Sequence, residues 1–170
     1  QGDVGSGKTI VSLLSAFNTV NSGFQVALMA PTEILARQHY TLAKEIFPKN
    51  INIKLISGKS DYKSKKIILN ELSKHKIDII FGTHAIFQKK VNFKKLGLII
   101  IDEQHKFGVN QRKKLSDKGG NNCDVLLMTA TPIPRTLTIT MYGDMDLSII
   151  REKPKSRKPI KTYRKIESKI

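Results

Sequence analysis

Residues 2–9, GDVGSGKT, place three glycines, a lysine and a threonine directly before an apolar run. They fit the spacing G-x-x-x-x-G-K-S/T, in which glycines let backbone N–H groups wrap a polyphosphate. Lys8 would reach the β- and γ-phosphates, and the Thr9 hydroxyl would ligate Mg²⁺. The alternative is a glycine-rich turn that matches by accident. The spacing favours an ATP and Mg²⁺ site formed by Gly2, Asp3, Val4, Gly5, Ser6, Gly7, Lys8 and Thr9.

A second candidate is the acidic pair Asp102-Glu103, which ends the apolar run LGLIII. In a phosphate-loop enzyme, an acid at such a strand tip holds Mg²⁺, often through water. The neighbouring carboxylate, here Glu103, can orient and deprotonate the attacking water. Gln104 and His105 would then contact the γ-phosphate or relay its state. The alternative is an exposed acidic turn, but Lys8 and Thr9 upstream favour catalysis by Lys8, Asp102 and Glu103.

A threonine-rich segment, MTATPIPRTL (128–137), follows a further apolar run. Thr129 and Thr131 could hydrogen-bond His105 or the acidic pair, and so couple the nucleotide state to another surface. Clusters of Ser, Thr and Pro also end strands routinely, which is the structural alternative.

Apolar runs that predict strands alternate with helical patterns along the chain. Near-continuous Val, Ile and Leu runs separated by helices are typical of a parallel sheet covered on both faces. The fold class predicted is therefore α/β. The expected strands are 25–30, 51–57, 77–82, 96–102 and 124–130; the expected helices are 33–47, with Thr32 as cap and Pro48 as stop, and 61–75.

The helix after the glycine loop carries apolar residues at helical spacing: Ile10, Leu13, Leu14 and Phe17, which predicts one buried face. Polar residues stand at or just beyond the ends of the expected strands: Thr32, Ser57, Thr83, Asp102 and Thr129. Ligands of open parallel sheets bind at that edge, so we expect the site there.

The composition indicates which kind of binding partner and which cellular location to expect. A length of 170 residues suits one domain, and a net charge of +16 favours a polyanionic partner, although lysines also serve solubility. The single cysteine, Cys123, excludes an internal disulfide and fits a reducing, cytoplasmic location. The four histidines lack the spacing of a zinc site. The apolar runs are too short to span a bilayer.

The ends of the chain predict a longer protein. Only Gln1 precedes the glycine loop, so the chain is expected to begin inside its motif. Residues 151–170 are rich in Lys, Arg and Pro and are expected to form a basic linker. Residues 1–150 would then be one lobe, truncated at its N-terminus, and the linker would lead to a second lobe.

Five segments together resemble the ordered motifs of superfamily 2 helicases: GDVGSGKT, APTEILARQH, GTHAIFQ, IDEQHKFGVNQR and TATPIPRTLTITMYGDMD. Within that superfamily they are most similar to the first motor lobe of the RecG family of branched-DNA helicases. The DEQH form of the acidic motif and the segment TATPIPRTL point to this family. The related transcription-repair coupling factor usually has DEEH in the acidic motif, so Gln104 favours the RecG family.

The resemblance implies a RecA-like lobe of an ATP-dependent motor that remodels forked DNA in repair and recombination. It implies ATP and Mg²⁺ as cofactors, branched DNA as partner, a second motor lobe in the same chain, and a monomer. Thr129 and Thr131 would link hydrolysis to the DNA surface. The resemblance also implies DNA-backbone contacts from Pro31, Thr32, Arg37, Ser57, Gly58, Thr83 and His84.

Two other functions stay open from the sequence. One is a module that binds ATP and nucleic acid without turnover, against which the acidic pair argues. The other is an RNA helicase lobe, whose acidic motif would more often read DEAD or DExH with SAT following. The segments that would supply an arginine finger and read adenine are not within these residues, so the chain alone is expected to be inactive.

Overall fold

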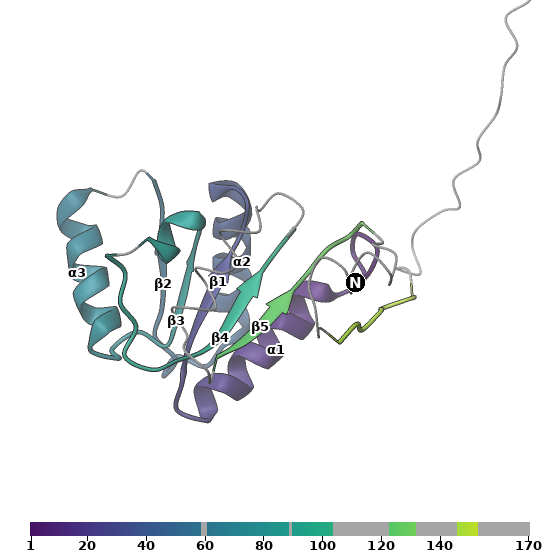
Figure 1. Cartoon of the computed structure of the whole chain (residues 1–170), viewed down its shortest axis with the longest axis horizontal. Helices are drawn as coiled ribbons and strands as arrows, with labels where there is room; N and C mark the ends of the chain where they lie inside the picture. Colours follow the sequence, from purple (N-terminus) through teal and green to yellow (C-terminus); the bar gives the residue numbers. More distant parts are fainter. Residues whose placement is uncertain (59–60, 89, 104–122, 132–145, 153–170) are drawn as a thin grey trace, which may run out of the picture.

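The computed structural model describes residues 1–58, 61–88, 90–103, 123–131 and 146–152 (Figure 1). These residues form a five-stranded, all-parallel sheet with the strand order β2-β3-β1-β4-β5. The strands are β1 (Gln25–Met29), β2 (Ile53–Ile56), β3 (Ile79–Gly82), β4 (Leu96–Ile101) and β5 (Asp124–Leu127). The helices are α1 (Lys8–Asn21), α2 (Glu33–Ile46) and α3 (Tyr62–Ser73), and a 3₁₀ turn, η1, spans His84–Phe87. The predicted α/β class with a parallel sheet is confirmed.

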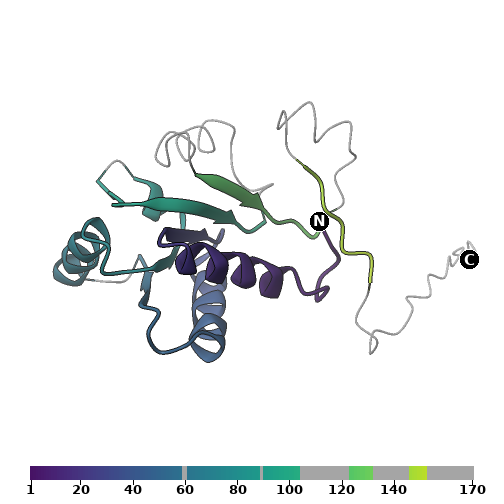
Figure 2. The same ribbon diagram turned by 90° about the horizontal axis from the view of Figure 1, so that it is seen from below.

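Helices cover both faces of the sheet, as expected for buried parallel strands. Side chains along β1 alternate between two apolar clusters. Val26 and Leu28 pack with α1 and α2, and Figure 2 shows these two helices together on one side of the sheet. Ala27 and Met29 pack with Leu72 of α3 on the opposite face. The strands that position the site are thus packed against helices on both faces of the sheet.

The ends of α2 follow the signals in the sequence. The Thr32 side chain accepts a hydrogen bond from the backbone N–H of Leu35 (3.3 Å), which caps the first turn. The helix ends at Ile46, two residues before Pro48. The predicted cap and stop are confirmed.

The predicted buried face of α1 is partly wrong. Leu13 is buried, but Ile10 is 43% exposed and Leu14 is 57% exposed. The helix contacts the sheet through a narrow stripe, which includes Leu13 and Ala16, and so its remaining apolar residues lie to one side. There they line a shallow groove of about 240 Å³ with the end of α2; its walls are Ile10, Leu13, Leu14, Phe17, Ile46, Phe47 and Pro48.

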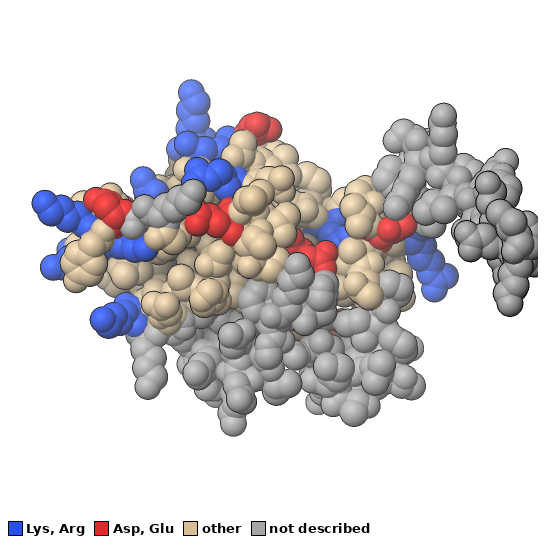
Figure 3. All heavy atoms as spheres, turned by 90° about the horizontal axis from the view of Figure 1, so that it is seen from above, with Lys and Arg blue, Asp and Glu red and all other residues tan. Residues whose placement is uncertain are grey.

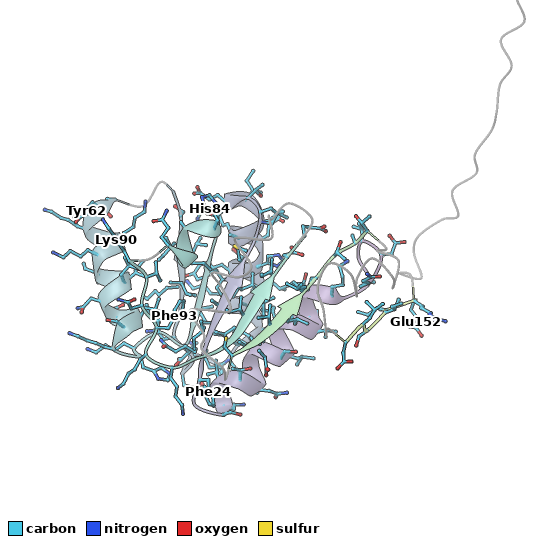
Figure 4. All side chains as sticks on the ribbon, viewed as in Figure 1. Phe24, Tyr62, His84, Lys90, Phe93 and Glu152 are labelled. Atoms are coloured by element: carbon cyan, nitrogen blue, oxygen red, sulfur yellow. The ribbon has the colours of Figure 1, made fainter. Side chains whose placement is uncertain are left out.

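Because the strands are parallel, their C-terminal ends lie at one edge of the sheet, the upper edge in Figure 1. Figure 4 shows His84, which follows β3, at this upper edge and Phe24, which precedes β1, at the lower edge. The predicted gathering of strand-end polar residues at one edge is confirmed. Within the described segments, no helix has the length and apolar character needed to cross a bilayer.

Candidate nucleotide and nucleic-acid site

The glycine loop has the backbone that its sequence requires. Gly5 and Gly7 have φ angles of 79° and 94°, in the left-handed region where a Cβ causes strain. Gly7 directly precedes α1, and no side chain caps the helix there. The first N–H groups of a helix without such a cap, together with its positive dipole end, form a natural anion site. The start of α1 therefore offers backbone donors to a ligand.

Polar groups inside the loop also point to a ligand. The Lys8 ammonium donates hydrogen bonds to the carbonyl oxygens of Gly2 (2.8 Å) and Asp3 (2.9 Å), which closes the loop on itself. The Ser6 hydroxyl is buried and has no hydrogen-bond partner among the described residues. A Cβ on Gly2 would approach that hydroxyl to 2.5 Å, so the loop has no room for a side chain there. Buried polar atoms usually have partners, so an orphan inside a cationic loop suits a polar, anionic ligand.

Backbone bonds fix the loop beside the end of β5. The N–H of Gly2 donates to the carbonyl of Thr129 (3.3 Å), and the N–H of Ile150 donates to the carbonyl of Gln1 (2.8 Å). The N–H of Met128, just after β5, donates to Ile101, the last residue of β4 (2.8 Å). The loop, the end of β5 and the end of β4 are therefore consecutive neighbours.

Asp102 and Glu103 leave the tip of β4, as predicted. Asp102 is buried (9% exposed), and its N–H donates to the carbonyl of Met29 at the end of β1 (2.9 Å). Glu103 has a φ of 50°, the left-handed conformation that non-glycine residues rarely adopt. Strained backbone of this kind clusters at functional sites. The φ of Glu103 thus places this conformation directly at the acidic pair.

The sequence did not single out His39, but the structure joins it to the acidic pair. Its Nε2 lies 2.8 Å from Oδ2 of Asp102, and both residues are buried. A carboxylate oxygen accepts hydrogen bonds, so in this contact an Nε2–H of His39 is the donor and Oδ2 of Asp102 the acceptor. One signal in the sequence could have found it: His39 stands between Ala36 and Ala43, at the spacing of a buried helix face.

The threonines after β5 bond within their own turn. The buried Thr129 hydroxyl accepts a hydrogen bond from the backbone N–H of Thr131 (3.1 Å). Gln104 and His105 lie outside the described residues, so their predicted contacts, and the coupling role of Thr129 and Thr131, stay predictions.

The residues for which the resemblance implies DNA contacts follow strands β1, β2 and β3. Pro31 and Thr32 follow β1, Ser57 and Gly58 follow β2, and Thr83 and His84 follow β3. Because the order is β2-β3-β1-β4-β5, they occupy one half of the edge, and Asp102, Thr129 and the glycine loop occupy the other. The sheet thus separates the two predicted sites along one edge.

Basic side chains lie on the half of the edge near β2. Arg37, on the second turn of α2, is 62% exposed at its side chain and pairs weakly with Glu33 (3.8 Å). Lys65 of α3 donates to the carbonyl of Gly58 (3.1 Å). Figure 3, which views this edge from above, shows Lys and Arg gathered on the left, the end at which α3 lies. This charge suits a polyanion laid along the loops after β2, β3 and β1.

A scan against protein families matches residues 1–139 to the model described as "DEAD/DEAH box helicase". The chain is 55% identical to the ATP-dependent DNA helicase RecG of Streptococcus pneumoniae over 95% of its length, and 52% identical to that of Bacillus subtilis over 96%. It spans only 24% of the length of each of these relatives.

Solved structures give the same fold. A structure of RecG bound to a three-way DNA junction superposes with a TM-score of 0.77 at 44% identity, over 93% of this chain and 21% of that one. The Pyrococcus furiosus Hef helicase domain superposes with a TM-score of 0.66 at 18% identity, over 89% of this chain and 33% of that one, which supports the fold alone. The predicted RecA-like lobe and the resemblance to RecG are confirmed. The chain belongs to the DEAD/DEAH box helicase family, a family of nucleotide-binding proteins.

Proposed function

We propose that this chain is the first motor lobe of a longer ATP-dependent DNA helicase that remodels branched DNA in repair and recombination. The observation that carries the proposal is the edge of the sheet. A glycine loop with an orphaned buried hydroxyl lies beside the end of β5, and the acidic tip of the neighbouring strand β4 follows along the same edge. Basic side chains and the residues predicted to contact the DNA backbone lie along the same edge. The relatives named as RecG, and the junction-bound RecG structure, support the choice of substrate.

Mg²⁺ is part of the proposal because the donor atoms fit it. Thr9 supplies a hydroxyl and Asp102 a carboxylate, and Mg²⁺ prefers oxygen ligands and takes its remaining ligands from phosphates and water. Within the described residues no cluster of three or more His, Cys, Asp or Glu could hold a metal alone. Such a partial donor set suits an ion that arrives with a nucleotide. When bound, the ion would neutralise charge on the phosphates.

The remaining roles belong to the protein. The loop amides and Lys8 would bind and orient the phosphates, and Glu103 would take the proton of the attacking water. The threonines after β5 would transmit the nucleotide state, since Thr129 contacts the loop through Gly2. Residues 151–170 would lead to a second lobe that supplies an arginine. The protein would act as a monomer in the cytoplasm.

The first test is equilibrium binding of a fluorescent ATP analogue to this chain. The proposal expects weak, Mg²⁺-dependent binding that Lys8→Ala removes. Lys49→Ala, at an exposed lysine before β2 on the opposite edge, is the control and should bind as the parent does. Equal binding by the parent and Lys8→Ala would contradict the nucleotide role of the loop.

A further inference from the structure

The bond between His39 and Asp102 crosses the boundary between the two halves of the sheet edge. Asp102 leaves β4, on the nucleotide half, and His39 belongs to α2, which begins directly after β1. Two candidates for DNA contact belong to that same helix: Thr32 caps its N-terminus and Arg37 lies on its second turn. The 2.8 Å contact therefore ties the acidic motif to the helix that carries these candidates.

The burial of the pair gives the bond a fixed geometry. His39 is 7% exposed and Asp102 is 9% exposed, so water competes little for either group. Among the described residues, His39 is the side chain that hydrogen-bonds Asp102, and it engages Oδ2. Oδ1 has no side-chain partner within the same residues. A carboxylate held through one oxygen presents the other in a defined direction.

We propose that His39 is a positioning residue, which orients the Asp102 carboxylate toward the Mg²⁺ that accompanies ATP. The inference rests on the proposed function, because it requires a nucleotide in the glycine loop. Partners that hydrogen-bond a metal-ligating group hold its orientation, and their loss typically lowers metal affinity by about 10- to 100-fold. His39 acts through Asp102 and does not itself touch the nucleotide.

The test is the Mg²⁺ concentration that gives half-maximal binding of a fluorescent ATP analogue to this chain. His39→Leu should raise that concentration about tenfold. Binding of the analogue in excess EDTA should stay unchanged, because the metal-free nucleotide does not depend on Asp102. His39→Gln should restore the parental Mg²⁺ dependence, because the glutamine amide can place an N–H where Nε2 lies. His39→Asn, which is shorter, should fail as His39→Leu does.

His75→Leu is a matched control, since it makes the same change in a residue that follows α3 at the opposite edge of the sheet. It should leave the Mg²⁺ dependence unchanged even if it lowers stability. Combining His39→Leu with Asp102→Asn supplies a second measurement. If His39 acts through Asp102, the double variant should behave as Asp102→Asn alone.

The inference is overturned if folded His39→Leu keeps the parental Mg²⁺ dependence, or if His39→Gln fails as badly as His39→Leu. Equal loss of binding with Mg²⁺ and with EDTA would show general disruption of the fold and would also overturn it. A parent whose binding is insensitive to Lys8→Ala would instead overturn the proposed function. The two failures are therefore distinguishable.

Discussion

The backbone N–H of Gly2 donates a hydrogen bond to the carbonyl of Thr129, at 3.3 Å. This bond joins the first residue of the glycine loop to the turn in which the Thr129 hydroxyl accepts from Thr131. If phosphate binding changes the loop as we propose, the change would reach that turn through a single direct contact. The contact gives the proposed coupling of nucleotide state to the segment after β5 a physical route.

Glu103 is predicted to be the general base. Glu103→Gln should leave ATP binding nearly intact, because Lys8, Thr9 and Asp102 remain. It should lower the rate of hydrolysis in the longer helicase by about 10²-fold or more, the usual contribution of a positioned base. Steady-state phosphate release and analogue binding, measured side by side, check both parts. Hydrolysis at a near-parental rate would show that another group takes the proton.

Arg37 is predicted to contact the DNA backbone. Arg37→Glu should weaken binding about equally for unrelated DNA sequences and should reduce the salt dependence of the affinity. Its pairing with Glu33 is solvent-exposed and contributes little to stability, so the effect on binding should dominate. Lys49→Glu makes the same charge reversal at the opposite edge and should have a smaller effect. Fluorescence anisotropy across a salt series checks this, and equal losses from both variants would argue against a defined DNA path.

Gln25 is predicted to be a major contributor to stability. Its buried side chain donates to the carbonyls of Leu72 (2.9 Å) and Ile77 (2.8 Å) and accepts from the N–H groups of Lys94 (2.8 Å) and Lys95 (3.0 Å). Gln25→Leu would leave these four backbone groups without that partner and should cost about 3–5 kcal/mol.

Urea unfolding checks the prediction for Gln25, with a lower midpoint at an unchanged m-value as the expected result. The exposed Gln38 on α2 offers the same substitution as a control, and Gln38→Leu should change stability by about 0.5 kcal/mol at most. Similar urea midpoints for the two variants would mean that the hydrogen bonds of the Gln25 side chain do not contribute to stability.

Cys123 is predicted to be unreactive near neutral pH. Burial, with a smaller contribution from the neighbouring Asp124 carboxylate, raises the pKa of its thiol to about 11. The thiolate is the reactive form, so its fraction at pH 8 is far below that of an ordinary cysteine. Alkylation by iodoacetamide should be about 100-fold slower than for a free thiol and should rise about tenfold from pH 7 to pH 8 and again to pH 9. A rate at pH 8 equal to that of free cysteine would contradict the raised pKa.

The sequence predicted the strands well because most of them are short, nearly continuous apolar runs between polar breaks; β2 is the exception, since Lys54 interrupts it. It also located the acidic pair, since Asp102 and Glu103 follow such a run directly. The order of the strands in the sheet could not be predicted from local sequence patterns. Strand β1 lies between β3 and β4, and only the packing of distant segments determines that arrangement.

Misplaced and missed residues have related causes. Helical spacing identified an apolar stripe on α1. Spacing alone does not show how wide the buried part of that stripe is, and Ile10 and Leu14 lie outside it. His39 and Gln25 are polar residues whose partners lie far away in the sequence, at Asp102 for the first and at residues 72–95 for the second. No local pattern reveals such partners. The boundary at residue 150 and the linker stay predictions, although Ile150 does pair with the start of the chain.

We propose above that this chain is one motor lobe of a DNA-driven ATPase. The most direct test is the ATP hydrolysis rate of two proteins, this 170-residue chain and the longer helicase proposed above, each with and without forked DNA. A second lobe that supplies an arginine finger contributes about 10³–10⁵ in rate. We expect negligible turnover by the chain alone, fork-stimulated turnover by the longer protein, and loss of that turnover in Lys8→Ala. Fork-stimulated turnover by the chain alone, abolished by Lys8→Ala, would contradict the proposal, as would stimulation of the longer protein by single-stranded RNA but not by forked DNA.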